Sequence, residues 1–140
     1  MRSGKTLIFF IVLFALIFLC GCGDERYTVD KFKDGQTVPE LEEKSVEAVH
    51  VGDKRLTGQT LSEFLEIYNR STVKFVDGGT TPDVQVFIFL TDGTRFCLDL
   101  VSSDAVEVRF DGVRTEQEIK LENPSLVEFI RSLVPKQDAD

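Results

Sequence analysis

Histidine and cysteine are scarce in this chain of 140 residues, which has one histidine and three cysteines. Any imidazole-dependent catalysis would have to use His50, which lies in a predicted strand and lacks the positioned partners that acid–base chemistry needs. Asp53 is near it in sequence, but no serine or cysteine in a recognisable nucleophile context completes a catalytic triad. We therefore expect a structural or surface role for His50, and a protein that is not an enzyme.

The sequence also lacks the loops that bind calcium or phosphate. The segment DGGTTPD, which contains Asp77 and Asp83, has no alternating acidic ligands of the EF-hand type. Gly78-Gly79 is not followed by the Lys-Ser/Thr pair of a phosphate-binding loop. We expect a plain turn here, and neither a metal nor a cofactor in the domain.

A long apolar run fills the start of the chain. Arg2 and Lys5 precede the uncharged segment TLIFFIVLFALIFL, residues 6–19. A basic segment, an apolar run of about 7–15 residues and then small residues is the layout of a secretory signal peptide. The alternative is a transmembrane anchor, which needs about 20 apolar residues. The run is shorter than that before glycines and an aspartate interrupt it, so a signal peptide is favoured.

Two cysteines, Cys20 and Cys22, follow this run immediately. The segment Leu19-Cys20-Gly21-Cys22 closely resembles the bacterial lipobox, in which a leucine three residues before and a glycine just before a cysteine mark the processing site. The resemblance implies thioether diacylglycerylation of Cys22 and cleavage between Gly21 and Cys22, with Cys20 lost in the signal peptide of residues 1–21. The alternative, a C-x-C metal or redox pair, needs further ligands that do not follow.

A lipid on Cys22 would hold the mature protein on the extracytoplasmic side of the cell membrane. Each buried methylene contributes about 0.8 kcal/mol and one acyl chain holds only marginally, so the two chains of a diacylglycerol give a stable anchor. Loss of residues 1–21 leaves residues 22–140 with 14 basic and 24 acidic side chains, a net charge of −10. This acidity argues against nucleic acid as a partner and against close contact with anionic headgroups.

The mature chain has the size of one domain, and Cys97 would be its only free thiol. No intrachain disulfide framework is then possible, so packing must stabilise the fold. We interpret residues 22–44, which mix charges of both signs, as a lipidated N-terminus and flexible tether with a short ordered piece at 27–32. Residues 45–135 form the domain, and residues 136–140 a frayed tail.

Strand and helix patterns alternate along the domain. We expect strands at 45–51 and 72–76, a meander of four strands within 84–122, and two helices. The first helix is predicted at 60–69 behind a Thr60–Glu63 capping box, and the second opens at Asn123-Pro124. This order predicts an α+β fold, an antiparallel meander sheet of about four to five strands with two helices packed on its aromatic face. Over residues 45–134 it loosely resembles uncharacterised small lipoproteins of Bacillus-like bacteria, a resemblance that transfers no active site.

The hairpin around Asp92-Gly93 gives the most specific prediction. A two-residue turn at these positions sets the register of the two strands. That register places on the core face Phe87, Phe89, Phe96 and Leu98. The opposite face then carries Val86, Ile88 and Leu90 beside Arg95, Cys97 and Asp99.

The second apolar face of this hairpin has two interpretations. In the first, a central strand is covered on both sides by the protein's own chain, as buried strands commonly are. In the second, the face is a partly exposed groove, with Glu107 on its rim, that docks a partner. The first is favoured. In the second, the candidate partner-binding residues are Val86, Ile88, Leu90, Arg95 and Asp99.

These features together predict a lipid-anchored, non-enzymatic binding or interaction module of the cell envelope. Its partner would be an envelope protein, and the isolated domain, residues 40–140, would be monomeric and folded. The alternatives are an inhibitor or immunity-type module that blocks a basic incoming enzyme or phage component, and a small envelope hydrolase. The single histidine disfavours the hydrolase.

Overall fold

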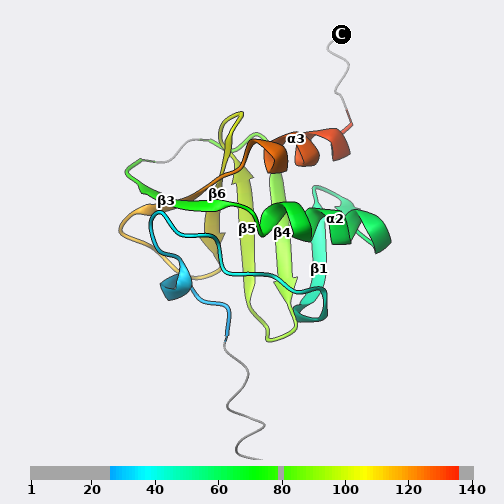
Figure 1. The fold of residues 1–140 in the computed structure, drawn as a ribbon, viewed down its shortest axis with the longest axis horizontal. Coiled ribbons are helices and arrows are strands. Elements are labelled where there is room, and N and C mark those ends of the chain that lie inside the picture. Colours follow the sequence, from blue (N-terminus) through cyan, green and yellow to red (C-terminus); the bar gives the residue numbers. More distant parts are fainter. Residues whose placement is uncertain (1–25, 79–80, 136–140) are drawn as a thin grey trace, which may run out of the picture.

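A seven-stranded antiparallel sheet organises the chain (Figure 1). The computed structural model describes residues 26–78 and 81–135. The strands, in chain order, are β1 (Val46–Val51), β2 (Lys54–Arg55), β3 (Thr72–Val76), β4 (Gln85–Leu90), β5 (Arg95–Leu100), β6 (Ala105–Phe110) and β7 (Glu118–Glu122). Their order across the sheet is β2-β1-β4-β5-β6-β7-β3.

The predicted α+β class is confirmed, and β4 to β7 form the expected meander. The sheet is larger than the four to five strands that we predicted. β2 has two residues, which is too short to show alternation. β3 lies at the far edge beside β7, although it precedes the meander in the sequence. Long-range pairing of this kind leaves no local sequence signal.

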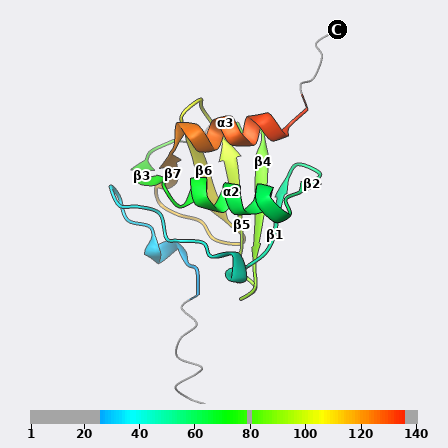
Figure 2. The same ribbon diagram turned by 45° about the vertical axis from the view of Figure 1, so that its right-hand side comes forward.

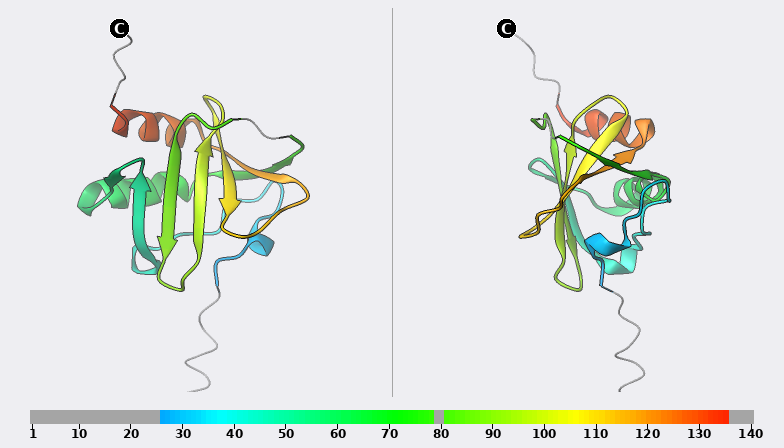
Figure 3. Two further views of the ribbon diagram at one scale, coloured as in Figure 1. Left: turned by 180° about the vertical axis from the view of Figure 1, so that it is seen from behind. Right: turned by 90° about the vertical axis from the view of Figure 1, so that its left-hand side faces the viewer.

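Two α-helices in the described residues, α2 (Gly58–Tyr68) and α3 (Pro124–Leu133), lie on the same face of the sheet (Figures 2 and 3). α3 begins as predicted, with Pro124 in its first turn and the Asn123 side chain accepting a hydrogen bond from the Leu126 N–H. α2 begins earlier than predicted. Its N-cap is Thr57, which makes no capping side-chain hydrogen bond, so the predicted capping box at Thr60 is wrong.

The segment before β1, which we predicted to be a flexible tether, packs against the same face of the sheet from Tyr27 onward. It contains the short 3-10 helices η1 (Val29–Lys31) and η2 (Glu43–Ser45). Its apolar side chains join the core, each less than 10 % exposed: Tyr27, Phe32, Val38 and Leu41. The ordered piece expected at 27–32 is therefore confirmed. The tether interpretation is wrong for residues 33–44, because Val38 and Leu41 are also buried in the core.

The β4–β5 hairpin has a register one residue away from the predicted one. Leu90 N–H donates to the Thr94 carbonyl at 2.9 Å, which closes a three-residue loop, and Gly93 adopts a positive φ of 89°. A loop of this length needs a residue in the left-handed region, and glycine provides it. Ile88 is therefore paired with Phe96, and Phe87 with Cys97. A shift of one residue exchanges the two faces of β4.

Residues 1–25 and 136–140 lie outside the described residues, so the signal peptide, the lipid on Cys22 and the frayed tail stay predictions. Within residues 26–78 and 81–135, neither helix combines the length and hydropathy that a membrane crossing requires.

Candidate functional site

One face of the sheet carries no helix in the described structure, as the edge-on view in Figure 3 shows. We call it the open face, and its central residues are His50, Phe87, Phe89, Arg95, Cys97, Asp99, Glu107 and Arg109. Phe87 is 40 % exposed, one of two large hydrophobic side chains that are exposed among the described residues. An aromatic side chain in the middle of an uncovered sheet face marks this surface as the candidate site.

A hollow of about 390 Å³ lies on the open face. Its lining includes the side chains of Phe87, Phe89, Arg95, Cys97 and Arg109. These residues come from the three neighbouring strands β4, β5 and β6. Aromatic side chains offer large apolar contact area, and guanidinium groups offer paired donors for carboxylate or phosphate. The hollow therefore offers apolar contact area together with two guanidinium groups, each of which is paired with a carboxylate.

Asp99 holds one of the two arginines in place. Its carboxylate is 2 % exposed, forms an ion pair with Arg109 Nε and accepts a hydrogen bond from Gln85 Nε2 at 3.0 Å. The hydrogen bond with Asp99 raises the pKa of Arg109. A buried carboxylate needs such partners to offset its desolvation. The Asp99–Arg109 pair thus positions a permanently charged guanidinium at the hollow. About half of the Arg109 side chain remains exposed to solvent.

Arg95 also lines the hollow and has a more weakly held partner. Its guanidinium is 3.5 Å from the Asp111 carboxylate, and both side chains are more than half exposed. Exposed pairs of this kind contribute about 0–1 kcal/mol. Arg95 can therefore leave Asp111 at little cost and turn toward a ligand.

Cys97 is held as a neutral thiol. Its Sγ donates to Asp99 Oδ1 at 3.2 Å, and burial together with this carboxylate raises the pKa of the thiol to about 12. Nucleophilic cysteines have the opposite shift. His50 lies two strands away, with Phe87 between it and Cys97, so the two side chains are separated by roughly 10 Å. The structure does not bring them together as a catalytic pair.

No group of three or more histidine, cysteine, aspartate or glutamate side chains within the described ranges could hold a metal ion. Two acidic side chains of the open face, those of Glu107 and Glu118, interact with each other. Glu107 on β6 is 7 % exposed, and one oxygen of Glu107 and one of Glu118 have no hydrogen-bond partner among the described residues. Burial, followed by the charges of Glu118 and Asp99, raises the pKa of Glu107. The fold thus opposes ionisation of Glu107, while the charge of Arg109 favours it.

The raised pKa of Glu107 predicts a pH-dependent stability. Folding opposes ionisation of this carboxyl, so the folded state loses stability as the pH rises through the ordinary pKa of 4.5. Glu107→Gln should therefore raise the melting temperature at pH 7, and the gain should shrink at pH 4. Circular dichroism melts at both pH values measure it. Glu116→Gln, at an exposed position, is the control with no expected gain, and a Glu107→Gln protein less stable than wild type at pH 7 would contradict the assignment.

The predicted partner-binding residues are divided between the two faces. Val86 and Ile88 are 0 % exposed and Leu90 is 3 % exposed, so the protein's own chain covers this face of β4. The favoured interpretation, in which both faces are covered, is correct for this face and wrong for the other, where Phe87 is exposed. The alternative interpretation, an exposed groove on that face, is wrong, because the helices and the N-terminal segment cover the face. Arg95 and Asp99 lie on the open face. Sequence reasoning missed Phe87 and Phe89 because their placement follows from the length of one loop.

The comparisons with known proteins add no further assignment. No protein-family model, curated protein or solved structure matches the chain. The geometry of the open face and the N-terminal sequence pattern are therefore the basis for a functional proposal.

Proposed function

We propose that this chain is a lipoprotein anchored through Cys22 on the extracytoplasmic side of the cell membrane, and that its domain is a non-enzymatic binding module of the cell envelope. The lipobox-like segment at residues 19–22 supports the anchor. The open face supports the binding role, and the partner that we propose is another envelope protein.

The observation that carries the binding role is the hollow beside the exposed Phe87. Interfaces commonly have an apolar centre within a polar rim, and arginine and aromatic residues contribute most of their binding energy. The hollow provides both kinds of residue, with Phe87 and Phe89 in its wall and Arg95 and Arg109 beside them. Complete burial of a phenylalanine side chain contributes about 1.5–3 kcal/mol. Because Phe87 is 40 % exposed in the isolated chain, a partner that covers its ring would gain part of this free energy on binding.

A non-enzymatic role is consistent with the chemistry of the same surface. Cys97 is held as a neutral thiol by burial and by its hydrogen bond to Asp99, and Arg109 is held by its ion pair with the same carboxylate. Each of these groups is positioned by a neighbour and is not prepared for proton transfer. Groups fixed in this way are suited to recognition, because little side-chain entropy is lost when a partner binds.

The test compares the proteins captured from detergent-solubilised membranes by wild type and by two variants. Phe87→Asp places a charge in the wall of the hollow, and we expect it to lose a partner that wild type captures in stoichiometric amount. Gln59→Asp adds the same charge at an exposed position on α2, on the covered side of the sheet, and should retain that partner. Equal capture by Phe87→Asp and wild type would contradict the open face as the binding surface.

A further inference from the structure

We propose that the domain is held on the membrane in one orientation, with the β4–β5 turn toward the lipid and the α3 end away from it. This inference rests on the proposed lipid anchor at Cys22. It follows from where the described chain begins and from how little chain separates that point from Cys22. The surface concerned is the turn at Thr91–Gly93 with the adjoining start of the chain at Arg26, and its partner is the lipid surface itself.

The start of the described chain is fixed to the β4–β5 turn. Tyr27 N–H donates to Asp92 Oδ2 at 3.3 Å, and Thr94 Oγ1 donates to the Tyr27 carbonyl at 3.4 Å. The ring of Tyr27 stacks on Phe96, with the ring centroids 5.0 Å apart, and its hydroxyl is hydrogen-bonded to that of Tyr68. With Tyr27 only 8 % exposed, the chain cannot leave this end of the domain without breaking core contacts.

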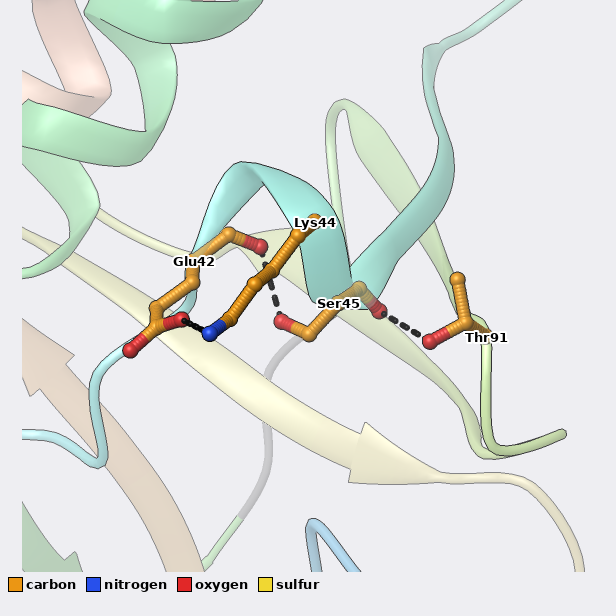
Figure 4. Close-up of polar contacts among 4 residues, drawn as sticks. All are labelled: Glu42, Lys44, Ser45 and Thr91. Carbon is orange, nitrogen blue, oxygen red and sulfur yellow. Dashed lines mark hydrogen bonds and ion pairs between the residues drawn. The ribbon is translucent and has the colours of Figure 1, made fainter. Parts of the chain in front are cut away.

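The turn itself is held by the segment before β1. Thr91 Oγ1 donates to the Ser45 carbonyl at 3.3 Å (Figure 4). The Thr91 N–H donates to the same oxygen at 2.9 Å. Ser45 Oγ donates to the Glu42 carbonyl at 2.7 Å, and Lys44 Nζ lies 3.0 Å from a Glu42 carboxylate oxygen. The exit point of the chain and the turn therefore belong to one ordered end of the domain.

The length of chain between Cys22 and Arg26 limits how far this end can move from the membrane. Cys22 lies four residues before Arg26, and four residues span at most about 14 Å. A domain of about 100 residues is roughly 35 Å across, from a radius of gyration of about 13 Å. Turning the opposite end to the membrane would carry Arg26 about 35 Å away, beyond the reach of the linker. The geometry therefore excludes the inverted orientation.

The opposite end of the domain is identified by the strand directions. β4 runs from Gln85 toward the turn, and β1 runs antiparallel to it. The β1–β2 turn, which contains Asp53, therefore lies at the far end of these strands, roughly 20 Å from Thr91 along six residues of β4. α3 lies at the same far end in Figure 1, away from the segment that begins at Arg26.

The turn faces the headgroups and does not insert into the bilayer. Thr91, Asp92 and Gly93 are exposed and none is apolar, and the mature chain has a net charge of −10 from its 14 basic and 24 acidic residues. The lipid on Cys22 provides the attachment, and the short linker provides the orientation. Because Phe89 and Arg95 form the last strand pair before the turn, the hollow is presented close to the membrane. A protein partner that binds the hollow must therefore approach it parallel to the membrane surface.

The experiment uses the full mature lipoprotein in phosphatidylcholine vesicles that contain a nitroxide-headgroup lipid. Cys97→Ser removes the free thiol and keeps a hydrogen-bond donor for Asp99, and a fluorophore is then attached at Thr91→Cys or at Asp53→Cys. We expect quenching at position 91 to exceed that at position 53 by at least about threefold, because roughly 20 Å separates them along β4. Inserting a flexible 20-residue Gly-Ser linker after Gly23, with a root-mean-square length of about 25 Å, should abolish the difference.

Any other result overturns the proposed orientation. Flotation of the protein with the vesicles shows separately whether the lipid anchor is correct. Equal quenching at both positions, or stronger quenching at position 53, on protein that co-floats with vesicles would refute the orientation and leave the anchor intact. A difference that survives the inserted linker would also refute it, because the linker length would then not set the orientation. Protein that does not float with the vesicles would refute the lipid anchor, and the orientation with it.

Discussion

Replacing Ile88 with aspartate should unfold the domain, whereas the same replacement at the neighbouring Phe87 should leave it folded. Ile88 is 0 % exposed and Phe87 is 40 % exposed, although both lie in β4. Truncating a buried isoleucine costs about 2–5 kcal/mol, and an unpaired carboxylate in the same place adds its desolvation. The sum approaches the whole stability of a small domain, about 5–15 kcal/mol. Urea unfolding followed by circular dichroism measures both variants.

This pair of variants tests the observed hairpin register directly. The register first expected from a two-residue turn would place Phe87 in the core, so Phe87→Asp would also unfold the protein. Ile88→Asp would then be tolerated only if the opposite face were open, so the folded Phe87→Asp variant is the result that separates the two registers. A matched pair at Phe96 and Arg95 gives an independent control, because Phe96 is 3 % exposed and Arg95 lies on the open face. Phe96→Ala should cost about 3–5 kcal/mol, and Arg95→Ala should cost about 1 kcal/mol or less.

A fragment of residues 40–140 should fail to fold cooperatively, in contrast to the sequence-based expectation. It lacks Tyr27, Phe32 and Val38, all of which are buried in the core. Phe32 packs edge-on against Phe110 with the ring centroids 5.5 Å apart, and Tyr27 stacks on Phe96. Each lost aromatic side chain costs about 3–5 kcal/mol, so the total is comparable to the stability of the domain.

The same truncation also removes backbone hydrogen bonds at the edge of the sheet. Gly35 N–H donates to the Val73 carbonyl, and Val73 N–H donates to the Gln36 carbonyl, each at 2.8 Å. Without this segment the outer edge of β3 is unpaired and available for aggregation. Thermal unfolding of 24–140 and 40–140 side by side measures the effect. A cooperative transition in the shorter fragment within a few degrees of the longer one would contradict the observed packing.

The elements of the domain could be predicted from the sequence where a local pattern was strong. The Asn123-Pro124 opening of α3 depends on neighbouring residues alone, and the structure confirms it. The antiparallel meander followed from the turn residues between successive strands. These local features were sufficient to predict the α+β class, because the prediction needed no long-range contacts.

The faces of β4 could not be predicted in the same way, because both of its faces are apolar. Where one face is polar, a register error would place polar side chains in the core and would be recognised. In β4 the observed register buries Val86 and Ile88, and the predicted register would bury Phe87 and Phe89. The two pairs are similarly hydrophobic. Only the loop length decides between them, and Thr91–Gly93 forms a three-residue loop with Gly93 at positive φ. The candidate site was missed for this reason.

The N-terminal segment was misread for a different reason. Its apolar residues Tyr27, Phe32, Val38 and Leu41 follow neither a helical nor a strand period, because the segment crosses the sheet as an irregular chain. Periodicity detects regular elements only. The ordering of this segment is what shortens the link to Cys22 and gives the membrane orientation that we propose.

The mass of the N-terminal peptide of the mature protein tests the lipid anchor, and with it the proposed function, most directly. We predict a chain that begins at Cys22 and carries a diacylglyceryl thioether, with a Cys20→Ala variant modified in the same way and a Cys22→Ala variant left as unmodified precursor. A wild-type protein that retains residues 1–21 and carries no lipid would contradict the account. A Cys20→Ala variant without lipid would contradict it as well.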